Sequence, residues 1–250
     1  MKKDLEDVIS RIKWPTYFVA YLWVVHLFKI LVGQEWVRLG IFSRETDGLI
    51  GIFFAPLIHS DFVHLASNSL PLFITGSLMM LFYPGVAPRA FTMMYFLTGF
   101  MVWLFARSGV YHIGASGVVY AMISFLFWSG IFRRSPKAIF LALTILVLYG
   151  GQFEGISPLQ PGVSWESHLL GGLMGIFVAY YFKSELESDE IQEKRWNHIP
   201  YDQRPFFLPR DIFEITREER RVRDEELAHQ AWLQQQALLG GEWNRNTTWE

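Results

Sequence analysis

Two polar residues inside apolar stretches, Ser116 and His168, could supply a nucleophile and its base. Ser116 lies at the start of the apolar block 114–132, and His168 near the start of the apolar block 166–182. A serine hydroxyl becomes reactive when an imidazole within hydrogen-bond reach takes its proton and later returns it to the leaving amine. Because an ionisable residue inside an apolar span is a functional candidate by default, we expect these two side chains to meet.

The serine also has a simpler explanation as a packing residue. Gly114 and Gly117 flank it, and small residues let membrane helices approach closely. The corresponding alternative for His168 is an imidazole that merely satisfies a neighbouring helix. An α/β-hydrolase is disfavoured, because Val118 stands where the G-x-S-x-G elbow needs its last glycine.

A second polar pair, His64 and Asn68, could bind a developing negative charge. The two residues are four apart in "HSDFVHLASN", so they project from the same face of a helix. Both can donate hydrogen bonds to an oxyanion, where one asparagine amide contributes roughly 3–4 kcal/mol. As ordinary polar contacts between membrane helices they would contribute only about 0.6 kcal/mol.

Further residues are spaced to support the serine and the histidine. Tyr120 lies one helical turn after the serine and could pack against the imidazole in place of a triad carboxylate. Three glycines follow the histidine at helical spacings and predict a face on which a second helix packs closely: Gly171, Gly172 and Gly175. Glu166 lies on a different helical face and is a poor orienting carboxylate.

Metal and thiol chemistry are both disfavoured. The chain has no cysteine, which removes disulfides and thiolate nucleophiles. A metal site built from His59, His64 and His168 is conceivable, but it lacks carboxylates at ligand spacing, and H-E-x-x-H is absent. We therefore predict no metal and no cofactor. The roles of His26, His59 and His112 stay open.

The elements that must position these residues are apolar blocks of membrane-spanning length. The chain has 250 residues, of which 51% are hydrophobic and 17% aromatic. Runs of about 20 apolar residues predict spans. We find six such blocks, at 16–33, 63–83, 88–106, 114–132, 137–152 and 166–182. The pattern indicates an all-α membrane protein, a bundle of six transmembrane helices.

The positions of Lys and Arg predict the orientation of this bundle. With the N-terminus in the cytoplasm, nine of these residues lie inside and four outside, as the positive-inside rule requires. Both termini are then cytoplasmic, and the second, fourth and sixth spans all begin near the outer surface. We expect their first turns to bring four side chains to one level: His64, Asn68, Ser116 and His168.

These motifs together resemble those of the rhomboid intramembrane serine proteases. The family pattern has two histidines and an asparagine on span two, G-x-S-G on span four and H-x-x-G-x-x-x-G on span six. The matching residues are His59, His64, Asn68, Gly114, Ser116, Gly117, His168, Gly171 and Gly175. Each motif is short, but all three occur in order. The resemblance covers about residues 15–183.

The resemblance implies a serine endopeptidase that hydrolyses peptide bonds of transmembrane substrates near the outer membrane face. Ser116 would be the nucleophile and His168 the general base of a Ser–His dyad. The oxyanion hole would use His64, Asn68 and the backbone N–H of the serine. The residues supporting the dyad would be Tyr120, Gly114, Gly117, Gly171 and Gly175.

Two other classes of protein are open alternatives. A non-catalytic rhomboid-like protein, which binds membrane clients, typically lacks the serine or the histidine, whereas this chain has both. A transporter or channel would place polar residues along a path through the membrane, whereas these cluster near one face. The expected partners are transmembrane protein substrates and the lipid bilayer of a bacterial inner membrane, with no nucleic acid and no metal.

The charge distribution divides the chain. Residues 1–183 carry 13 Lys and Arg against 9 Asp and Glu, whereas residues 184–250 carry 9 against 15. We predict a cytoplasmic N-terminal segment at 1–15, a six-span membrane domain at 16–183 and an acidic, partly helical cytoplasmic tail at 184–250.

Two local features complete the predictions. In the tail, Thr216 and Glu219 have the spacing of a capping box at the start of a helix. The fifth span is short and precedes a loop rich in Gly and Pro, so we expect it to be the lateral entrance for substrates. Bulky residues such as Phe140 and Leu148 are expected to hold it against the second span.

Overall fold

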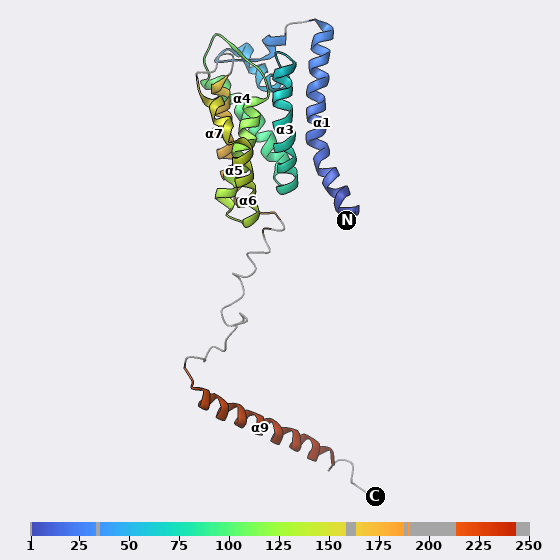
Figure 1. Ribbon diagram of the computed structural model, residues 1–250, viewed down its shortest axis with the longest axis vertical. Coiled ribbons are helices and arrows are strands. Elements are labelled where there is room, and N and C mark those ends of the chain that lie inside the picture. The colour runs from blue at the N-terminus through green and yellow to red at the C-terminus, as the bar shows by residue number, and fades with distance from the viewer. Residues whose placement is uncertain (1, 34–35, 159–163, 188–189, 191–213, 244–250) are drawn as a thin grey trace. The chain divides into compact units, whose positions relative to one another are not determined.

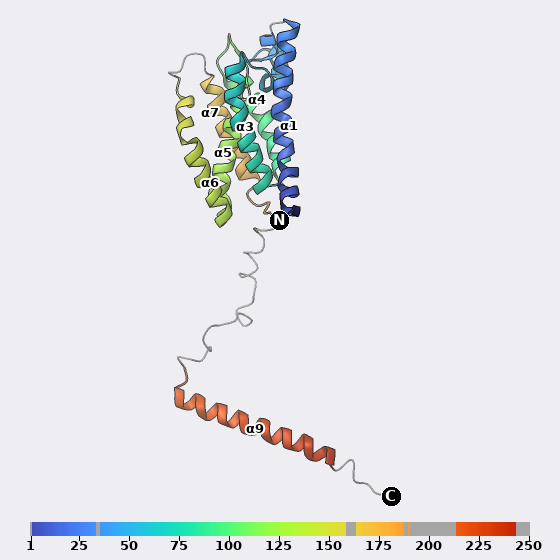
Figure 2. The ribbon, with the colours of Figure 1, turned by 45° about the vertical axis from the view of Figure 1, so that its right-hand side comes forward.

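The computed structural model describes residues 2–33, 36–158, 164–187, 190 and 214–243. The chain divides into two compact units, residues 1–194 and 195–250, and each is described by itself. The long helices of the first unit are α1 (Lys2–Val32), α3 (Phe62–Phe82), α4 (Ala87–Phe105), α5 (Ser116–Arg133), α6 (Pro136–Tyr149) and α7 (Trp165–Tyr181). They run side by side (Figures 1 and 2).

These six helices lie where the six apolar blocks predict helices. Among the described residues, three helical stretches are long and apolar enough to cross a membrane: Leu5–Val32, Phe62–Phe82 and Ser116–Arg133. Pro136–Tyr149 is a shorter apolar helix. The protein is therefore a predominantly helical membrane protein. The helix α1 begins at Lys2 and passes through the predicted boundary at residue 15 without a break.

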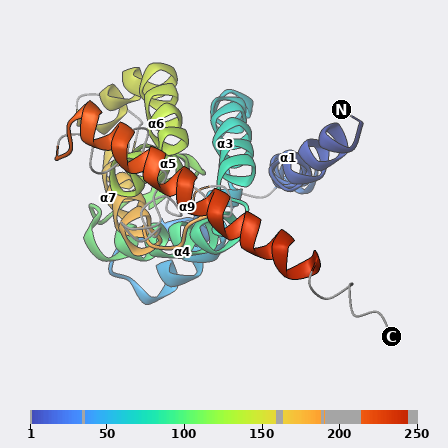
Figure 3. The same ribbon diagram turned by 90° about the horizontal axis from the view of Figure 1, so that it is seen from below.

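Helix α5 is the centre of this unit. It contacts α3, α4, α6 and α7, and in the end-on view of Figure 3 these four helices lie around it. Most of its buried apolar residues belong to the main core cluster, which includes Ala121, Met122, Phe125 and Leu126. The central position of α5 explains how its first residue can meet side chains from several other helices.

Short elements cover the end of the unit where α5 begins. The segment between α1 and α3 forms η1 (Trp36–Leu39), β1 (Ile41–Phe42), η2 (Thr46–Ile50), α2 (Gly51–Phe54) and η3 (Ala55–Leu57). Strand β1 pairs antiparallel with β2 (Tyr111–His112), which lies just before α5. The backbone N–H of Gly114, two residues after β2, donates to the carbonyl oxygen of Ala55 at 2.8 Å. These contacts fix the chain that leads into Ser116.

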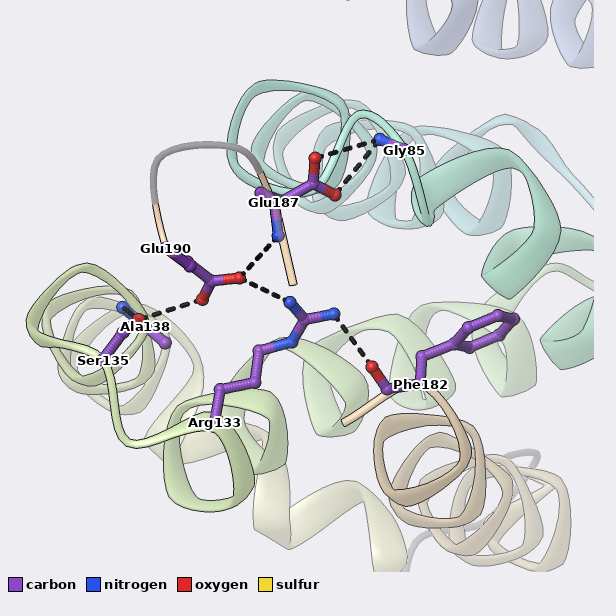
Figure 4. Close-up of polar contacts among 7 residues, drawn as sticks. All are labelled: Gly85, Arg133, Ser135, Ala138, Phe182, Glu187 and Glu190. Carbon is purple, nitrogen blue, oxygen red and sulfur yellow. Dashed lines mark hydrogen bonds and ion pairs between the residues drawn. The ribbon is translucent and has the colours of Figure 1, made fainter. Parts of the chain in front are cut away.

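The opposite end of α5 is held by buried charges (Figure 4). The side chains of Arg133 and Glu190 are 0% and 2% exposed, and they form an ion pair at 2.7 Å. Glu190 also accepts from the hydroxyl of Ser135 at 2.9 Å, and Arg133 donates to the carbonyl of Phe182 at 3.1 Å. This Arg133 network joins the end of α5, the N-cap of α6 and the segment after α7.

The expectation that Phe140 and Leu148 hold α6 against α3 is wrong. These side chains are 66% and 55% exposed. Helix α6 packs instead on α5, where a Cβ on Gly130 would lie 2.5 Å from the Cβ of Ala142. The inward face of α6 carries Leu141, Ile145 and Tyr149, which are buried in the main core cluster, whereas Phe140 and Leu148 lie on the outward face.

In the second unit, α9 (Arg217–Trp243) begins with the predicted capping box. The backbone N–H of Glu219 donates to the hydroxyl oxygen of Thr216 at 3.3 Å, and the backbone N–H of Thr216 donates to the Glu219 carboxylate at 2.8 Å. This prediction is confirmed. Residues 188–189, 191–213 and 244–250 of the predicted tail lie outside the described residues.

Candidate active site

Ser116 is the first residue of α5, and two residues before it stands a glycine with a left-handed backbone. Gly114 has φ +102°, which residues with a Cβ rarely adopt. The turn at Gly114 lets the chain enter the helix beside the short elements described above. The first backbone N–H groups of a helix have no partners within it, so the start of α5 offers donors and a positive dipole end next to the serine.

Helices α5 and α7 approach closely through glycines. A Cβ on Gly171 would lie 2.0 Å from the carbonyl oxygen of Gly117, and one on Gly175 would lie 2.2 Å from that of Ala121. A residue with a Cβ at either position would force the two helices to shift apart. Gly117 follows the serine directly, and Gly171 follows the histidine by one turn, so the two residues lie on neighbouring turns of the packed helices.

Gly172 does not belong to this contact, and its inclusion in the predicted glycine face is wrong. A Cβ built on Gly172 meets nothing within 4 Å. The reason is the helical period: relative to His168, positions 171 and 175 lie to one side of the residue, whereas position 172 is rotated to the other. Gly172 lines an apolar cavity of about 300 Å³ between α5, α6 and α7 instead.

His168 is held in one orientation by two contacts. Its imidazole stacks on the ring of Tyr120, with the ring centroids 4.2 Å apart and the planes 9° from parallel. Its Nδ1 lies 2.8 Å from the carbonyl oxygen of Gly155, in η4 (Gly150–Ile156). A carbonyl oxygen can only accept, so Nδ1 carries the proton and donates. In the neutral imidazole, Nε2 is then left with a free lone pair.

His64 lies against the turn that precedes the serine. A Cβ on Gly114 would lie 2.6 Å from Nε2 of His64. On the other side of the ring, Nδ1 lies 3.1 Å from the hydroxyl oxygen of Ser60. That hydroxyl donates to the carboxylate of Asp61 at 2.7 Å, so it accepts from His64. The proton on Nδ1 is thereby fixed, and Nε2 faces Gly114.

Asp61 supplies a negative charge next to Ser60 and His64. Its carboxylate caps α3 by accepting from the backbone N–H of His64 at 2.9 Å. That bond, followed by the bond from Ser60, lowers the pKa of Asp61 below its ordinary value. Asp61 is therefore ionised at neutral pH and compensates any positive charge on the neighbouring imidazole.

The remaining predicted residues occupy the same region with different contacts. Asn68 is 5% exposed, and its amide donates to the carbonyl of His64 at 2.9 Å, which occupies one of its two N–H groups. His59 is fully buried, and its ring meets that of His64 edge to face at 5.0 Å. Burial, followed by the nearby histidines, lowers the pKa of His59 to about 3. His59 is therefore neutral under physiological conditions.

Three interactions that a catalytic or metal site could contain are not seen among the described residues. Among the described residues there is no hydrogen bond between Ser116 and His168, a pair whose contact often shortens when substrate binds. No group of three or more His, Asp or Glu residues in the described part of the chain could hold a metal ion. Glu166 pairs with Arg107 at 3.5 Å rather than with the histidine.

Sequence reasoning missed the parts of this site that depend on loops. Gly155 belongs to the segment read only as a loop rich in Gly and Pro, and nothing in its type announces a hydrogen bond to an imidazole. Ser60 and Asp61 stand inside the quoted histidine motif, where their types suggest a helix cap. That signal predicts the cap but not the bond to Nδ1 of His64.

Comparison with known proteins identifies the family of the chain. The sequence model of the Rhomboid domain matches residues 46–185, more than half of the chain. The chain belongs to the rhomboid family. The match begins in η2 and ends after α7, so it contains all the site residues and excludes α1 and α9.

Similar sequences occur in mycobacteria. The chain is 37% identical over 171 residues to the uncharacterized protein Rv1337 of Mycobacterium tuberculosis, an alignment that covers 65% of this chain and 71% of that protein. It is 33% identical over 171 residues to the uncharacterized protein ML1171 of Mycobacterium leprae, covering 65% and 68%. The rhomboid family is one of intramembrane serine proteases, which agrees with the resemblance in the sequence motifs.

Proposed function

We propose that the protein is an intramembrane serine endopeptidase in which Ser116 is the nucleophile and His168 the general base. The observation that carries this proposal is the state of the imidazole. Nδ1 is bound to the Gly155 carbonyl and the ring rests on Tyr120, so Nε2 is the nitrogen available as a base. The glycine contact between α5 and α7 brings this base beside the first turn of α5.

The reaction follows from these roles. Nε2 of His168 takes the hydroxyl proton as Oγ of Ser116 attacks the scissile carbonyl carbon. The tetrahedral intermediate collapses when the C–N bond breaks and Nε2–H returns the proton to the departing amine. A water molecule, deprotonated by the same nitrogen, then hydrolyses the acyl-enzyme and frees the serine. The Gly155 carbonyl accepts from Nδ1–H throughout, in the place a carboxylate has in a Ser-His-Asp triad.

The oxyanion would be bound by the backbone N–H of Ser116, by the second N–H of Asn68 and by His64. Because Nδ1–H of His64 is bonded to Ser60, Nε2 can donate only when the ring is an imidazolium. The carboxylate of Asp61 favours that state, since it is ionised at neutral pH and lies one residue from Ser60. His64 would therefore contribute to the proposed oxyanion hole only in its protonated form.

The proposal includes an orientation in the membrane. The six long helices would be the six spans of a bacterial inner-membrane protein, with both termini in the cytoplasm and Ser116 near the outer face. The positive-inside distribution of Lys and Arg supports this orientation. Transmembrane segments would be the substrates, and water would reach the dyad from the outer side.

The test is cleavage of a transmembrane substrate by the purified protein in lipid vesicles. We expect Ser116→Ala to abolish cleavage while the unfolding temperature stays unchanged, because alanine preserves the small side chain at the start of α5. A chelator should leave the rate unchanged, and a serine-directed phosphonate should abolish it. Cleavage by Ser116→Ala at a rate near that of the wild type would refute the proposal.

A further inference from the structure

His112 lies at the junction between the strand that leads to Ser116 and the helix that carries His168. It is 4% exposed and pairs with Ile41 in the β1–β2 ladder. Four residues later the chain reaches Ser116. Both ring nitrogens have partners: Nδ1 lies 2.7 Å from the hydroxyl oxygen of Ser164, and Nε2 lies 3.2 Å from the carbonyl oxygen of Arg107.

The carbonyl partner fixes the direction of this network. A carbonyl oxygen can only accept, so Nε2 of His112 carries the proton and, in the neutral ring, Nδ1 accepts from the hydroxyl of Ser164. Burial lowers the pKa of His112, so the neutral ring is the state at neutral pH. The oxygen of Ser164 lies 2.7 Å from that of Ser167 and can accept from it. The hydrogen bonds therefore run from Ser167 through Ser164 and His112 to Arg107.

The side chain of Ser164 takes part in this network instead of capping its helix. It is the N-cap residue of α7, yet its side chain makes no capping hydrogen bond. A serine at this position ordinarily binds a free backbone N–H of the first turn, an interaction worth about 1 kcal/mol. Here its hydroxyl binds His112 instead, so the start of α7 is tied sideways to β2.

At its other end, the network reaches the close contact between α5 and α7, the two helices that carry the proposed dyad. Ser167 directly precedes His168, and a Cβ on Gly117 would lie 3.1 Å from the carbonyl oxygen of Ser167. The loop after α4 is attached to the same region, since Arg107 pairs with Glu166 at 3.5 Å.

We propose that His112 is a positioning residue that sets the separation between Ser116 and His168. It connects the segment before the nucleophile to the first turn of the helix carrying the base, through uncharged hydrogen bonds and without touching the reacting atoms. A shift of about 1 Å between two reacting groups can cost about 100-fold in rate. The inference rests on the proposed dyad, and its test separates the two.

The test compares His112→Phe, which keeps a ring but loses both hydrogen bonds, with His112→Gln, which keeps one donor and one acceptor. We expect His112→Phe to lower kcat on a transmembrane substrate about 10- to 100-fold with KM changed less than about 2-fold. His112→Gln should recover most of this loss. Ser164→Ala should resemble His112→Phe, and the double variant should be no slower than either single variant, because the two residues act through one bond.

The control is His26→Phe. His26 is also a buried histidine, 2% exposed, but it lies on α1 and packs against Phe62. We expect its kcat to stay within about 2-fold of the wild type. A wild-type kcat in His112→Phe would overturn the inference, as would a loss that His26→Phe shows equally or that His112→Gln does not recover.

A second readout does not depend on turnover. In ¹⁵N spectra of imidazole-labelled protein, His168 should carry its proton on Nδ1 and His112 on Nε2. His112→Phe should shift the His168 resonances, because the start of α7 loses its tie to β2, whereas His26→Phe should not. If the wild type proves inactive, the proposed protease function fails while this comparison still decides the role of His112. Unchanged His168 resonances in His112→Phe would refute it.

Discussion

The two ends of α5 hold their neighbours by different means. At the Ser116 end, most contacts are glycine against backbone and hydrogen bonds of neutral imidazoles, hydroxyls and carbonyls, and the Arg107 side chain of the ion pair found there is about half exposed. At the Arg133 end, a buried ion pair joins three segments, and the Arg133 guanidinium lies 4.6 Å from the centre of the Tyr83 ring. A neutral hydrogen bond can rearrange during a reaction, whereas an unpaired buried charge is very costly. The difference indicates that one end serves chemistry and the other serves stability.

The largest effect is expected at the Ser116 end. His168→Gln should lower kcat/KM on a transmembrane substrate by at least about 10³-fold, because it removes the only base proposed for the serine. The unfolding temperature should change little. The same replacement at the buried His26 is the control and should leave the rate within about 2-fold. A His168→Gln protein that cleaves at more than a tenth of the wild-type rate would show that another group is the base.

The opposite pattern is expected at the Arg133 end. Glu190→Gln removes the ion-pair partner of the buried Arg133 and should cost about 3–5 kcal/mol of unfolding free energy. Activity per folded molecule should stay within about 2-fold. Glu185→Gln removes an ion pair with Arg89 that is about half exposed and should cost at most about 1 kcal/mol.

A double variant tests whether the charges at this end are needed for function. Arg133→Leu combined with Glu190→Leu removes both charges and should recover most of the lost stability, since apolar pairs can replace buried ion pairs. The measurement is thermal unfolding in detergent beside the cleavage assay. A selective loss of kcat in folded Glu190→Gln protein would contradict the division between the two ends.

Two neighbouring glycines of α7, near the Ser116 end of α5, are expected to respond differently to substitution by alanine. Gly171→Ala would bring its Cβ to 2.0 Å from the carbonyl oxygen of Gly117, and overpacking of this kind costs about 1–3 kcal/mol. Gly172→Ala meets nothing within 4 Å and should stabilise the helix slightly, because alanine favours helix over glycine by about 1 kcal/mol. Gly171→Ala should also reduce the cleavage rate. Equal unfolding temperatures for the two variants would refute the close contact of α5 with α7.

The smallest effects are expected from pH, with opposite signs at the two ends. The lowered pKa of Asp61 stabilises the fold above the ordinary pKa of aspartate, and this contribution is lost as pH falls through the lower folded value. Burial raises the pKa of Glu187, so its contribution is present below the ordinary pKa of glutamate and is lost as pH rises through the higher folded value.

Amide variants measure these two contributions separately. At pH 7, Asp61→Asn should lower the unfolding temperature and Glu187→Gln should raise it. Both differences should shrink when the measurement is made in acid, below the folded pKa of Asp61 and the ordinary pKa of glutamate. A shift of the same sign for both variants at pH 7 would contradict the assigned environments.

How far the sequence predicts this structure depends on the range of the contacts involved. The helices follow from local apolar runs, and the capping box at Thr216 follows from two residues three apart. The glycine contact between α5 and α7 follows from helical spacing, except that Gly172 takes no part in it. These features are encoded within a few turns of chain, so periodicity and cap preferences are sufficient to find them.

The missed features join segments far apart in the sequence. The pairing of Ile41 with His112 and the bond between Gly155 and the base depend on where loops return, which no periodicity encodes. The positive-inside count includes Arg133 simply as one of the nine cytoplasmic Lys and Arg residues, yet its side chain is 0% exposed. A charge at a helix end can be solvated or paired in the interior, and its distant partner Glu190 decides which.

Chemical labelling of the nucleophile tests the proposed dyad most directly. The wild-type protein in lipid vesicles is treated with a fluorophosphonate, and the modified residue is identified by mass spectrometry, alongside the His168→Gln and His26→Gln variants. The proposed dyad predicts one adduct, on Ser116, formed at the wild-type rate in His26→Gln and at least about 10³-fold more slowly in His168→Gln. An adduct on another residue, or labelling of Ser116 at an unchanged rate without His168, would contradict the proposed dyad.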